Sequence, residues 1–227
     1  MKRFPERGMD KIIYIIRHAE TDLNKKGMVQ GRGIDTDINE CGRKQAEAFF
    51  QAYKNIPFDK IYTSTLKRTH QTVKKFIDKG IPWTQFEGLD EIAWGMFEGR
   101  ENTEDVKLAY EKLTQGWSAG KLDAKFENGE TPLQVLERQK DVLKEIIQDD
   151  GSHYILICMH GRAMRLFLCL LTHRSPSEMQ YFPHTNTALY KLKYDGQNFR
   201  ITEFNNTDHL KKINGENTNF DCFLHKQ

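Results

Sequence analysis

The sequence contains few cysteines, and their spacing does not suggest a metal site. The chain has four in 227 residues, and no two of them form a C-x-x-C pair. No cluster of histidines adds the spacing expected of metal ligands. We therefore predict no metal and no other cofactor, and a reduced, cytoplasmic protein. The four residues are Cys41, Cys158, Cys169 and Cys222.

Long hydrophobic runs and a strong charge of one sign are also lacking. The apolar runs at 12–16 and 166–171 are too short for a signal-peptide core or a membrane span. The formal net charge is +2, and the Lys and Arg residues are scattered rather than gathered into a basic stripe. These features argue against a membrane protein and against a nucleic-acid binder.

Several well-known phosphate-chemistry motifs are missing as well. The cysteine-phosphatase pattern needs an Arg six residues after its Cys, but Glu47 and Met164 stand at that distance from Cys41 and Cys158. The segment 35–39 begins like an aspartyl-phosphatase or calcium loop, yet it lacks the preceding apolar strand and the Gly at the sixth position. No G-x-x-x-x-G-K-[ST] loop occurs.

The order of apolar segments predicts an α/β protein. We expect strands at 12–16, 59–64 and 153–159, a strand-like segment within 86–100 that then turns, and a closing hairpin at 187–204. Strands that alternate with helices are typical of a three-layer α/β/α sandwich with a mostly parallel central sheet. A chain of 227 residues suits one domain of this kind, with a small helical lid inserted.

Helices are expected between these strands. One begins near Arg43, and one runs from about Thr65 to Gly80. A third begins at Thr131, which forms a capping box with Gln134, and has Pro132 in its first turn. A fourth follows the strand at 153–159 directly, after a break at Gly161.

Two of the apolar strands end on a histidine. The segments YIIRHAET and LICMHGRA place His18 and His160 in the loops where their strands end, which is the edge where open α/β sheets bind ligands. Arg17 precedes the first histidine, and Arg68 follows the strand at 59–64. A single histidine in such a loop is more often structural, and either arginine alone could make a surface salt bridge. Grouped guanidiniums at one sheet edge instead indicate a phosphate site.

Six segments resemble those of one known family, in the same order, across residues 12–210. They are RHAETDLN, VQGRGIDTDINECGRKQA, IYTSTLKRTHQT, LDEIAWGMFEG, CMHGRAMR and NNTDHL. The first resembles the R-H-G-E-T-x-x-N signature of the histidine phosphatase superfamily, also called the phosphoglycerate mutase-like family. The resemblance implies an enzyme that hydrolyses phosphomonoesters of small metabolites without a metal.

The resemblance also implies roles for individual residues. His18 is the expected nucleophile that becomes phosphorylated, and Glu91 is the expected general acid and then the base for water. The residues expected to hold the phosphoryl group are Arg17, Arg68 and a protonated His160. Four further residues are expected to line the substrate end: Asn24, Gln30, Gly31 and Gly161.

Phosphoryl transfer suits this residue set on chemical grounds. The transition state is loose, so positioning and neutralisation of charge do most of the work. A neutral imidazole is a competent nucleophile, because its unperturbed pKa is about 6.5. A phosphohistidine divides one difficult displacement into two easier ones.

The sequence departs from the family pattern at two positions near the expected site. Ala19 stands where Gly is usual, which restricts positive φ there. Arg162 replaces a Gly or another small residue beside the second histidine, where it could crowd or recharge the pocket. Neither change removes a catalytic group, so activity is the preferred interpretation.

The identity of the acid stays open on physical grounds alone. Glu98 competes with Glu91 for the role, and only the family position favours Glu91. Glu20 is interpreted as a structural hydrogen-bond partner of its loop. His184 is interpreted as a packing or surface residue, with a pocket role as the less favoured alternative.

Domain organisation follows from the same resemblance. We expect one catalytic domain over 1–210, with a lid insertion at about 101–130, and a polar tail at 211–227. Glu91 and His160 are 69 residues apart, a shorter span than in family mutases, so the phosphatase branch is favoured. The aromatic residues that would shape the lid, or simply pack in the core, are Trp94, Tyr110, Trp117 and Phe126.

Three alternatives and two open questions remain. The alternatives are a phosphoglycerate-type phosphomutase, a catalytically weak phosphoryl-binding protein and, least favoured, a two-histidine metallohydrolase. The expected partner is a small phosphorylated substrate. The physiological substrate and the oligomeric state are open, a homodimer included.

Overall fold

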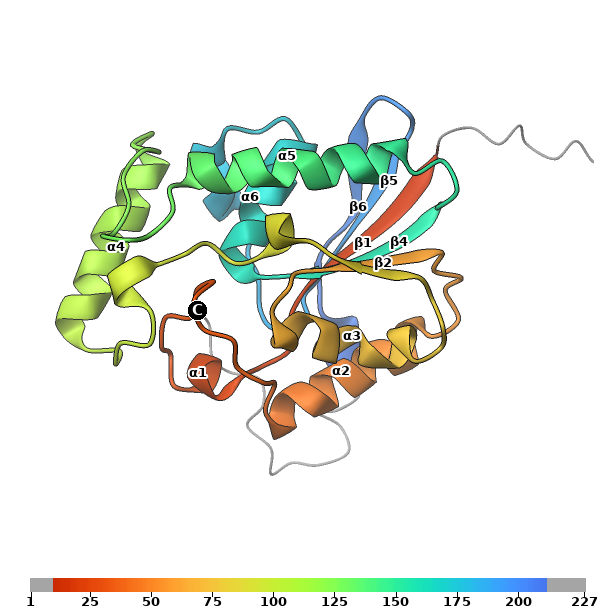
Figure 1. Cartoon of the computed structure of the whole chain (residues 1–227), viewed down its shortest axis with the longest axis horizontal. Helices are drawn as coiled ribbons and strands as arrows, with labels where there is room; N and C mark the ends of the chain where they lie inside the picture. The colour runs from red at the N-terminus through yellow and green to blue at the C-terminus, as the bar shows by residue number, and fades with distance from the viewer. Residues whose placement is uncertain (1–9, 212–227) are drawn as a thin grey trace, which may run out of the picture.

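A six-stranded sheet runs through the middle of the molecule, with helices on both faces (Figure 1). The computed structural model describes residues 10–211. The strand order is β3-β2-β4-β1-β5-β6, in which β3, β2, β4 and β1 are mutually parallel and β5 is antiparallel to both neighbours. The strands are β1 (Lys11–Arg17), β2 (Lys60–Thr63), β3 (Trp83–Gln85), β4 (Tyr154–Met159), β5 (Leu189–Tyr194) and β6 (Phe199–Asn206). The predicted mostly parallel α/β sheet is confirmed.

The helices form the two outer layers. On one face lie α2 (Glu40–Tyr53) and α3 (Lys67–Ile77), and on the other lie α5 (Pro132–Gln148) and α6 (Gly161–Leu171) (Figure 1). The short α1 (Asp22–Lys25) lies in the loop after β1, and α4 (Glu104–Ser118) stands at the end of the molecule away from the strands (Figure 1). Within residues 10–211 there are also three 3₁₀ turns: η1 (Glu87–Leu89), η2 (Gly95–Phe97) and η3 (Pro176–Tyr181).

Strand β1 is apolar at successive positions because both of its faces are covered. Ile13 and Ile15 pack into the core on the α5 and α6 side, whereas Tyr14 and Ile16 pack into the core beneath α2 and α3. Side chains alternate across a strand, so a strand buried on both sides has no polar face. After Lys11 at its start, the next charged residue of the strand is Arg17, where the strand reaches the edge of the sheet.

Two sequence expectations differ in detail from the structure. The segment 86–100 forms two 3₁₀ turns rather than a strand, and the second of them is bounded by Gly95 and Gly99, which take positive φ values of 56° and 72°. Helix α3 begins at Lys67 rather than Thr65, because the Thr65 N–H donates to the Asp90 carboxylate instead of entering the helix. The capping box at Thr131 is present as predicted.

Two further expectations concern the chain as a whole. None of the helices within residues 10–211 has the length and apolar character needed to cross a membrane. The predicted polar tail at 211–227 lies, apart from Lys211, outside the described residues.

Candidate active site

Three parallel strands bring the predicted residues together at one sheet edge. The residues that follow β1, β2 and β4 are His18, Ser64 and His160, and the His18 N–H donates to the last carbonyl of β4 at 2.9 Å. The imidazole rings of His18 and His160 have their centroids 5.2 Å apart. The convergence expected from the two histidine-bearing strands is therefore present.

The hydrogen bonds of His18 fix which ring nitrogen is available. Nδ1 lies 2.7 Å from the carbonyl oxygen of Ala19, which can only accept, so Nδ1 carries the proton. The lone pair is therefore on Nε2. Burial, reinforced by the positive charges of Arg68 and Arg17, holds the pKa of His18 well below its ordinary value. His18 is consequently a neutral imidazole at physiological pH, as a nucleophile requires.

Arg68 is fully buried and tied into the site by three hydrogen bonds. Its Nε donates to His160 Nδ1 at 3.1 Å, and its Nη groups donate to the carbonyls of Ile34 and Gly31 at 2.7 and 3.2 Å. Burial lowers the pKa of Arg68 to about 10, so it remains a cation. These bonds hold the guanidinium rigidly at the sheet edge.

His160 is neutral in this arrangement, which differs from the protonated form expected. Since Arg68 Nε can only donate, His160 Nδ1 accepts, and the ring proton lies on Nε2, 2.7 Å from Ser64 Oγ. Burial and the nearby Arg68 charge also hold the pKa of His160 well below its ordinary value. The two arginines, rather than His160, supply the positive charge.

Arg17 is buried beside His184. Its Nη1 lies 3.2 Å from His184 Nδ1, which must accept, so His184 carries its proton on Nε2. Burial lowers the pKa of Arg17 to about 10, and burial together with the Arg17 charge holds the pKa of His184 well below its usual range. The less favoured interpretation of His184, a pocket residue, is thus the one that the geometry supports.

Glu91 is held at the N-terminus of α6. Its Oε1 accepts from the N–H groups of Ile92 and Ala163 at 2.9 and 2.8 Å, and its Oε2 accepts from the Arg162 N–H at 3.0 Å. A helix N-terminus favours a negative charge at this place. Both carboxyl oxygens are therefore positioned by backbone groups next to His160.

The chain matches a known protein family over most of its length. The model of the histidine phosphatase superfamily (branch 1) matches residues 13–207. The chain belongs to the histidine phosphatase superfamily. This confirms the resemblance seen in the six sequence segments.

Individual members of the histidine phosphatase superfamily resemble the chain closely in length. Phosphoserine phosphatase 1 of Hydrogenobacter thermophilus is 29% identical, over 89% of this chain and 95% of the relative. A broad-specificity phosphatase of Saccharomyces cerevisiae is also 29% identical, over 87% of this chain and 86% of the relative. The solved structure of an Entamoeba histolytica phosphoserine phosphatase with 3-phosphoglyceric acid has a TM-score of 0.76 and 25% identity, covering 88% of this chain and 99% of that one.

Two of the four residues expected at the substrate end, Asn24 and Gln30, have polar side chains with different surroundings. Asn24 is buried, and Asn186 Nδ2 donates both to its Oδ1 and to the carbonyl of His18. Gln30 instead has both ends of its amide bound within its own loop, to Thr21 and Thr36. These two contacts hold the loop around Gln30, and its expected place at the substrate end stays a prediction.

The two glycines are required by close approach. A Cβ on Gly31 would lie 2.1 Å from Glu98 Oε1 and 2.9 Å from the carbonyl of Ile92. A Cβ on Gly161 would lie 2.7 Å from the ring of His184. Both glycines therefore let neighbouring loops close around the site.

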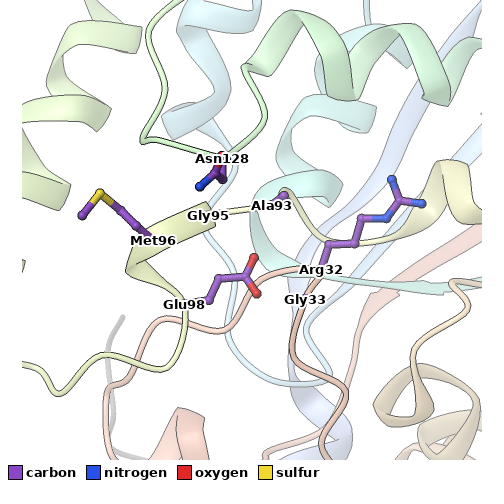
Figure 2. Close-up of a pocket in the computed structure, with 7 residues that line it drawn as sticks. All are labelled: Arg32, Gly33, Ala93, Gly95, Met96, Glu98 and Asn128. Carbon is purple, nitrogen blue, oxygen red and sulfur yellow. The ribbon is translucent and has the colours of Figure 1, made fainter.

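Glu98 lines a pocket of about 520 Å³ next to the loop that carries Gly31 (Figure 2). Its Oε1 accepts from the Trp94 N–H at 2.9 Å, and burial raises its pKa. Figure 2 shows the carboxylate turned toward the chain at Gly33. The other lining residues are Arg32, Gly33, Ala93, Gly95, Met96 and Asn128.

The remaining acidic residue of the first motif has a structural contact. Glu20 Oε1 accepts from Asn39 Nδ2, the side chain that also caps α2. This agrees with the interpretation of Glu20 as a hydrogen-bond partner of its loop.

Three residues around the site were not identified from the sequence: Ser64, Arg138 and Asn186. Arg138 on α5 donates to the carbonyls of Glu87, Gly88, Asp90 and Glu91, and so positions the whole loop that carries the Glu91 carboxylate. The position of Ser64 at the end of the expected strand at 59–64 could have suggested a site residue. No feature of the sequence marks Arg138, which lies in the middle of a helix, or Asn186, which lies in an irregular loop.

Ala19 fits the histidine phosphatase loop without strain. It is fully buried, its N–H donates to Thr72 Oγ1 at 2.9 Å, and among the described residues it is not one of those with positive φ. The backbone conformation at this position therefore does not need a glycine.

Proposed function

We propose that this protein hydrolyses phosphomonoesters of small metabolites through a phosphohistidine at His18, without a metal ion. The observation that carries the proposal is the protonation pattern of His18. Its Nδ1 proton is donated to the Ala19 carbonyl, and its Nε2 lone pair belongs to a neutral ring on which the charges of two buried guanidiniums act. Relatives over nearly the full length of the chain are named phosphatases.

The first proposed step is transfer of the phosphoryl group to His18. Nε2 attacks phosphorus, the bond from phosphorus to the ester oxygen breaks, and the leaving alkoxide takes a proton from a carboxyl group. Arg17 and Arg68 neutralise the charge on the phosphoryl oxygens. We assign the proton transfer to Glu91, because its carboxyl group lies next to His160 at the sheet edge. The negative charge of the bound phosphate favours the protonated carboxyl group, against the backbone N–H groups that stabilise the carboxylate.

The second proposed step is hydrolysis of the phosphohistidine. A water molecule loses a proton to the same carboxylate and attacks phosphorus, and the bond from phosphorus to Nε2 breaks. The products are inorganic phosphate and His18 in its starting form. Ser64 and Arg68, which hold the His160 ring by both nitrogens, keep the second imidazole in place through both steps.

The same contacts weigh against a two-histidine metallohydrolase. Both ring nitrogens of His160 are engaged, one by an arginine N–H and one by Ser64. A metal ion would have to displace Arg68 from Nδ1 or Ser64 from Nε2 to bind this ring. The binding-only alternative also loses one of its arguments, because Ala19 fits the loop.

We further propose that residues 101–130 form the lid of a catalytic domain that spans 1–210. Helix α4 supplies Tyr110 and Trp117, whose rings pack on Trp94 with centroids 4.9 and 5.5 Å away. This aromatic cluster reaches the first turn of α6 through Arg162, whose guanidinium lies 5.8 Å from the Trp117 ring. A cytoplasmic location is proposed from the small number of cysteines and their spacing.

The test is turnover of 4-nitrophenyl phosphate in the presence of a chelator. We expect wild-type protein to be active and His18→Ala to lose at least about 10³-fold in kcat. His70→Ala, which removes a partly exposed histidine on α3, is the matched control and should retain activity. Quenching in alkaline detergent during turnover should leave phosphate on the wild-type protein in an alkali-stable form that is lost on acidification, and none on His18→Ala. Full activity of His18→Ala, or complete loss of activity with chelator, would contradict the proposal.

A further inference from the structure

Thr187 has an unusual backbone conformation beside the phosphate site. Its φ is +56°, and the residue is completely buried in the loop that joins η3 to β5. A β-branched residue seldom takes positive φ, because its side chain then crowds the backbone. Such a conformation persists only where the surrounding contacts impose it, and it is often found where it contributes to function. The contacts of this loop therefore need a functional explanation.

The loop is bound to the end of β1 through both its backbone and a side chain. The Thr187 N–H donates to the carbonyl of Arg17 at 3.1 Å, and the Arg17 N–H donates back into the loop at 3.3 Å. Next to this turn, Asn186 Nδ2 donates to the carbonyl of His18 at 2.9 Å and to Asn24 Oδ1 at 3.2 Å. Both partners are acceptors, so the orientation of the Asn186 amide is fixed.

The bond from Asn186 fixes a peptide group next to the reacting ring. The carbonyl of His18 and the N–H of Ala19 belong to one planar peptide unit. Asn186 holds the carbonyl end of this unit, and Thr72 Oγ1 accepts from the N–H end at 2.9 Å. The following carbonyl, that of Ala19, accepts the Nδ1 proton of His18. Rotation of the peptide unit would therefore move the acceptor that decides which ring nitrogen carries the lone pair.

A histidine that follows β6 contacts Thr187 from the other side. His209 lies in the helical turn at 208–211, within the segment NNTDHL, to which the proposed reaction assigns no role. It is only 5% exposed, its Nε2 lies 3.0 Å from Thr187 Oγ1, and its ring packs edge-on against Phe49 and Tyr53. Its Nδ1 is buried and has no hydrogen-bond partner within residues 10–211. Since an apolar ring could pack there and leave no polar atom unsatisfied, packing alone does not account for a histidine.

We propose that His209, acting through Thr187, positions Asn186 and so holds the His18 nucleophile in its reactive orientation. His209 keeps the Thr187 hydroxyl in place, the hydroxyl holds the turn at positive φ, and the turn directs the Asn186 amide to the His18 carbonyl. All three act through other protein groups and are therefore positioning residues. This inference rests on the proposed function, in which His18 Nε2 attacks phosphorus. The turn after β6 is thereby connected to the reacting ring.

The first experiment uses two variants that each remove one side of the contact between Thr187 and His209. Thr187→Val removes the hydroxyl and keeps the shape of the side chain, and His209→Phe keeps an aromatic ring against Phe49. We expect each to lower kcat for 4-nitrophenyl phosphate by about tenfold and to leave KM within about twofold, because the nucleophile is misplaced while the arginines still bind phosphate. Thr187→Ser keeps the hydroxyl and should stay within about threefold of the wild-type kcat. His70→Phe, at a partly exposed histidine, is the matched control and should retain full activity.

Combining the variants tests whether the three residues form one path. Thr187→Val and His209→Phe break the same contact, so the double variant should have a kcat within about twofold of the slower single variant. Asn186→Ala, at a half-buried position outside the core, should lower kcat by about 10–100-fold. Asn198→Ala, the same change at an exposed asparagine between β5 and β6, should have no effect. An unchanged kcat in Asn186→Ala, or losses that multiply in the double variant, would overturn the inference while leaving the proposed function intact.

The tautomer of His18 provides a readout that does not depend on turnover. In wild-type protein labelled with ¹⁵N-histidine, long-range proton–nitrogen correlation spectra should show a proton on His18 Nδ1 and none on Nε2, with the signals assigned by their loss in His18→Ala. Asn186→Ala and Thr187→Val should populate the other tautomer, whereas Asn198→Ala should not. A His18 signal that is the same in all of these variants would refute the positioning role, whether or not the protein is a phosphatase. An inactive wild-type protein that shows the expected tautomers would count against the proposed function alone.

Discussion

The phosphate pocket and the lid end of the site both contain buried arginines, but these arginines differ in how many hydrogen bonds their side chains make. In the pocket, Arg68 makes three side-chain hydrogen bonds to groups on neighbouring segments. At the lid end, Arg162 makes one, to a tyrosine hydroxyl, and rests among aromatic rings. A closed network fixes geometry for a reaction common to all substrates. The guanidinium of Arg162 is held instead mainly by packing against aromatic rings.

The largest expected effect comes from breaking the closed network with Arg68→Met. The residue has no exposure, and its removal takes a donor from His160 Nδ1 and from the carbonyls of Ile34 and Gly31. We expect the free energy of unfolding to fall by about 3–5 kcal/mol and kcat for 4-nitrophenyl phosphate to fall about 10³-fold. Urea denaturation and steady-state kinetics measure the two quantities.

Arg162→Met and Arg43→Met serve as controls for that variant. The first replaces a buried, poorly paired cation by an apolar side chain, so stability should stay within about 1 kcal/mol of wild type. The second removes an exposed arginine from α2 and should change stability by less than about 0.5 kcal/mol. If Arg162→Met proved as destabilising as Arg68→Met, the difference between the two ends of the site would be refuted.

Acidification should lower the free energy of unfolding, because the buried His18 and His160 and the partly buried His184 are held neutral in the folded state. Their folded-state pKa values lie well below the value of about 6.5 expected in the unfolded chain. The folded state therefore binds fewer protons, so this stability is present above about pH 6.5 and is lost as the pH falls below it.

Between pH 7.5 and 5.5 the expected loss is about 1.4 kcal/mol for each such histidine, or about 4 kcal/mol for the three. Urea denaturation at pH 7.5, 6.5 and 5.5 measures it. His184→Asn removes one of these groups and should reduce the dependence by about one third. A free energy of unfolding that stayed constant from pH 6.5 to 5.5 would show that these rings are not held neutral.

Arg138→Met tests whether hydrogen bonds outside the reacting groups also position the catalytic residues. The side chain fastens the loop that carries Glu91 through four backbone carbonyls. We expect kcat to fall by about 10–100-fold through misplacement of the Glu91 carboxylate. KM for 4-nitrophenyl phosphate should change little, and Arg138→Lys should recover only part of the loss. A change in KM alone would place Arg138 in substrate binding instead.

The sequence was sufficient to predict the parallel core and the residues at its edge. An apolar strand followed directly by Arg17 and His18 indicates a polar site at the end of that strand, and Pro132 within a capping box marks the start of a helix. These signals are local, since each depends on residues close together in the chain.

Features that depend on tertiary contacts could not be predicted from the sequence. The neutral state of His160 follows from an Arg68 donor 92 positions away, and the role of Gln30 follows from partners on its own folded loop. The apolar pattern of 86–100 is like that of a strand. It does not show that Gly95 has positive φ and lies so close to the Glu127 carbonyl that a side chain there would clash. Arg162 stands out in the sequence as a departure from the family pattern, but its aromatic surroundings come from α4 and the 93–98 segment.

The smallest effect is expected from Ala19→Gly, which restores the residue usual in the family. Ala19 has no positive φ, and its N–H is already bound to Thr72, so a glycine gains no needed conformation. It does gain entropy in the unfolded chain, which should lower the free energy of unfolding by about 0.5–1 kcal/mol. Turnover should stay within about twofold of wild type, because the Ala19 carbonyl that orders the His18 ring is retained. A rise in kcat of tenfold or more would mean that the alanine restricts the phosphate pocket, and that the pocket is less completely formed than its hydrogen bonds indicate.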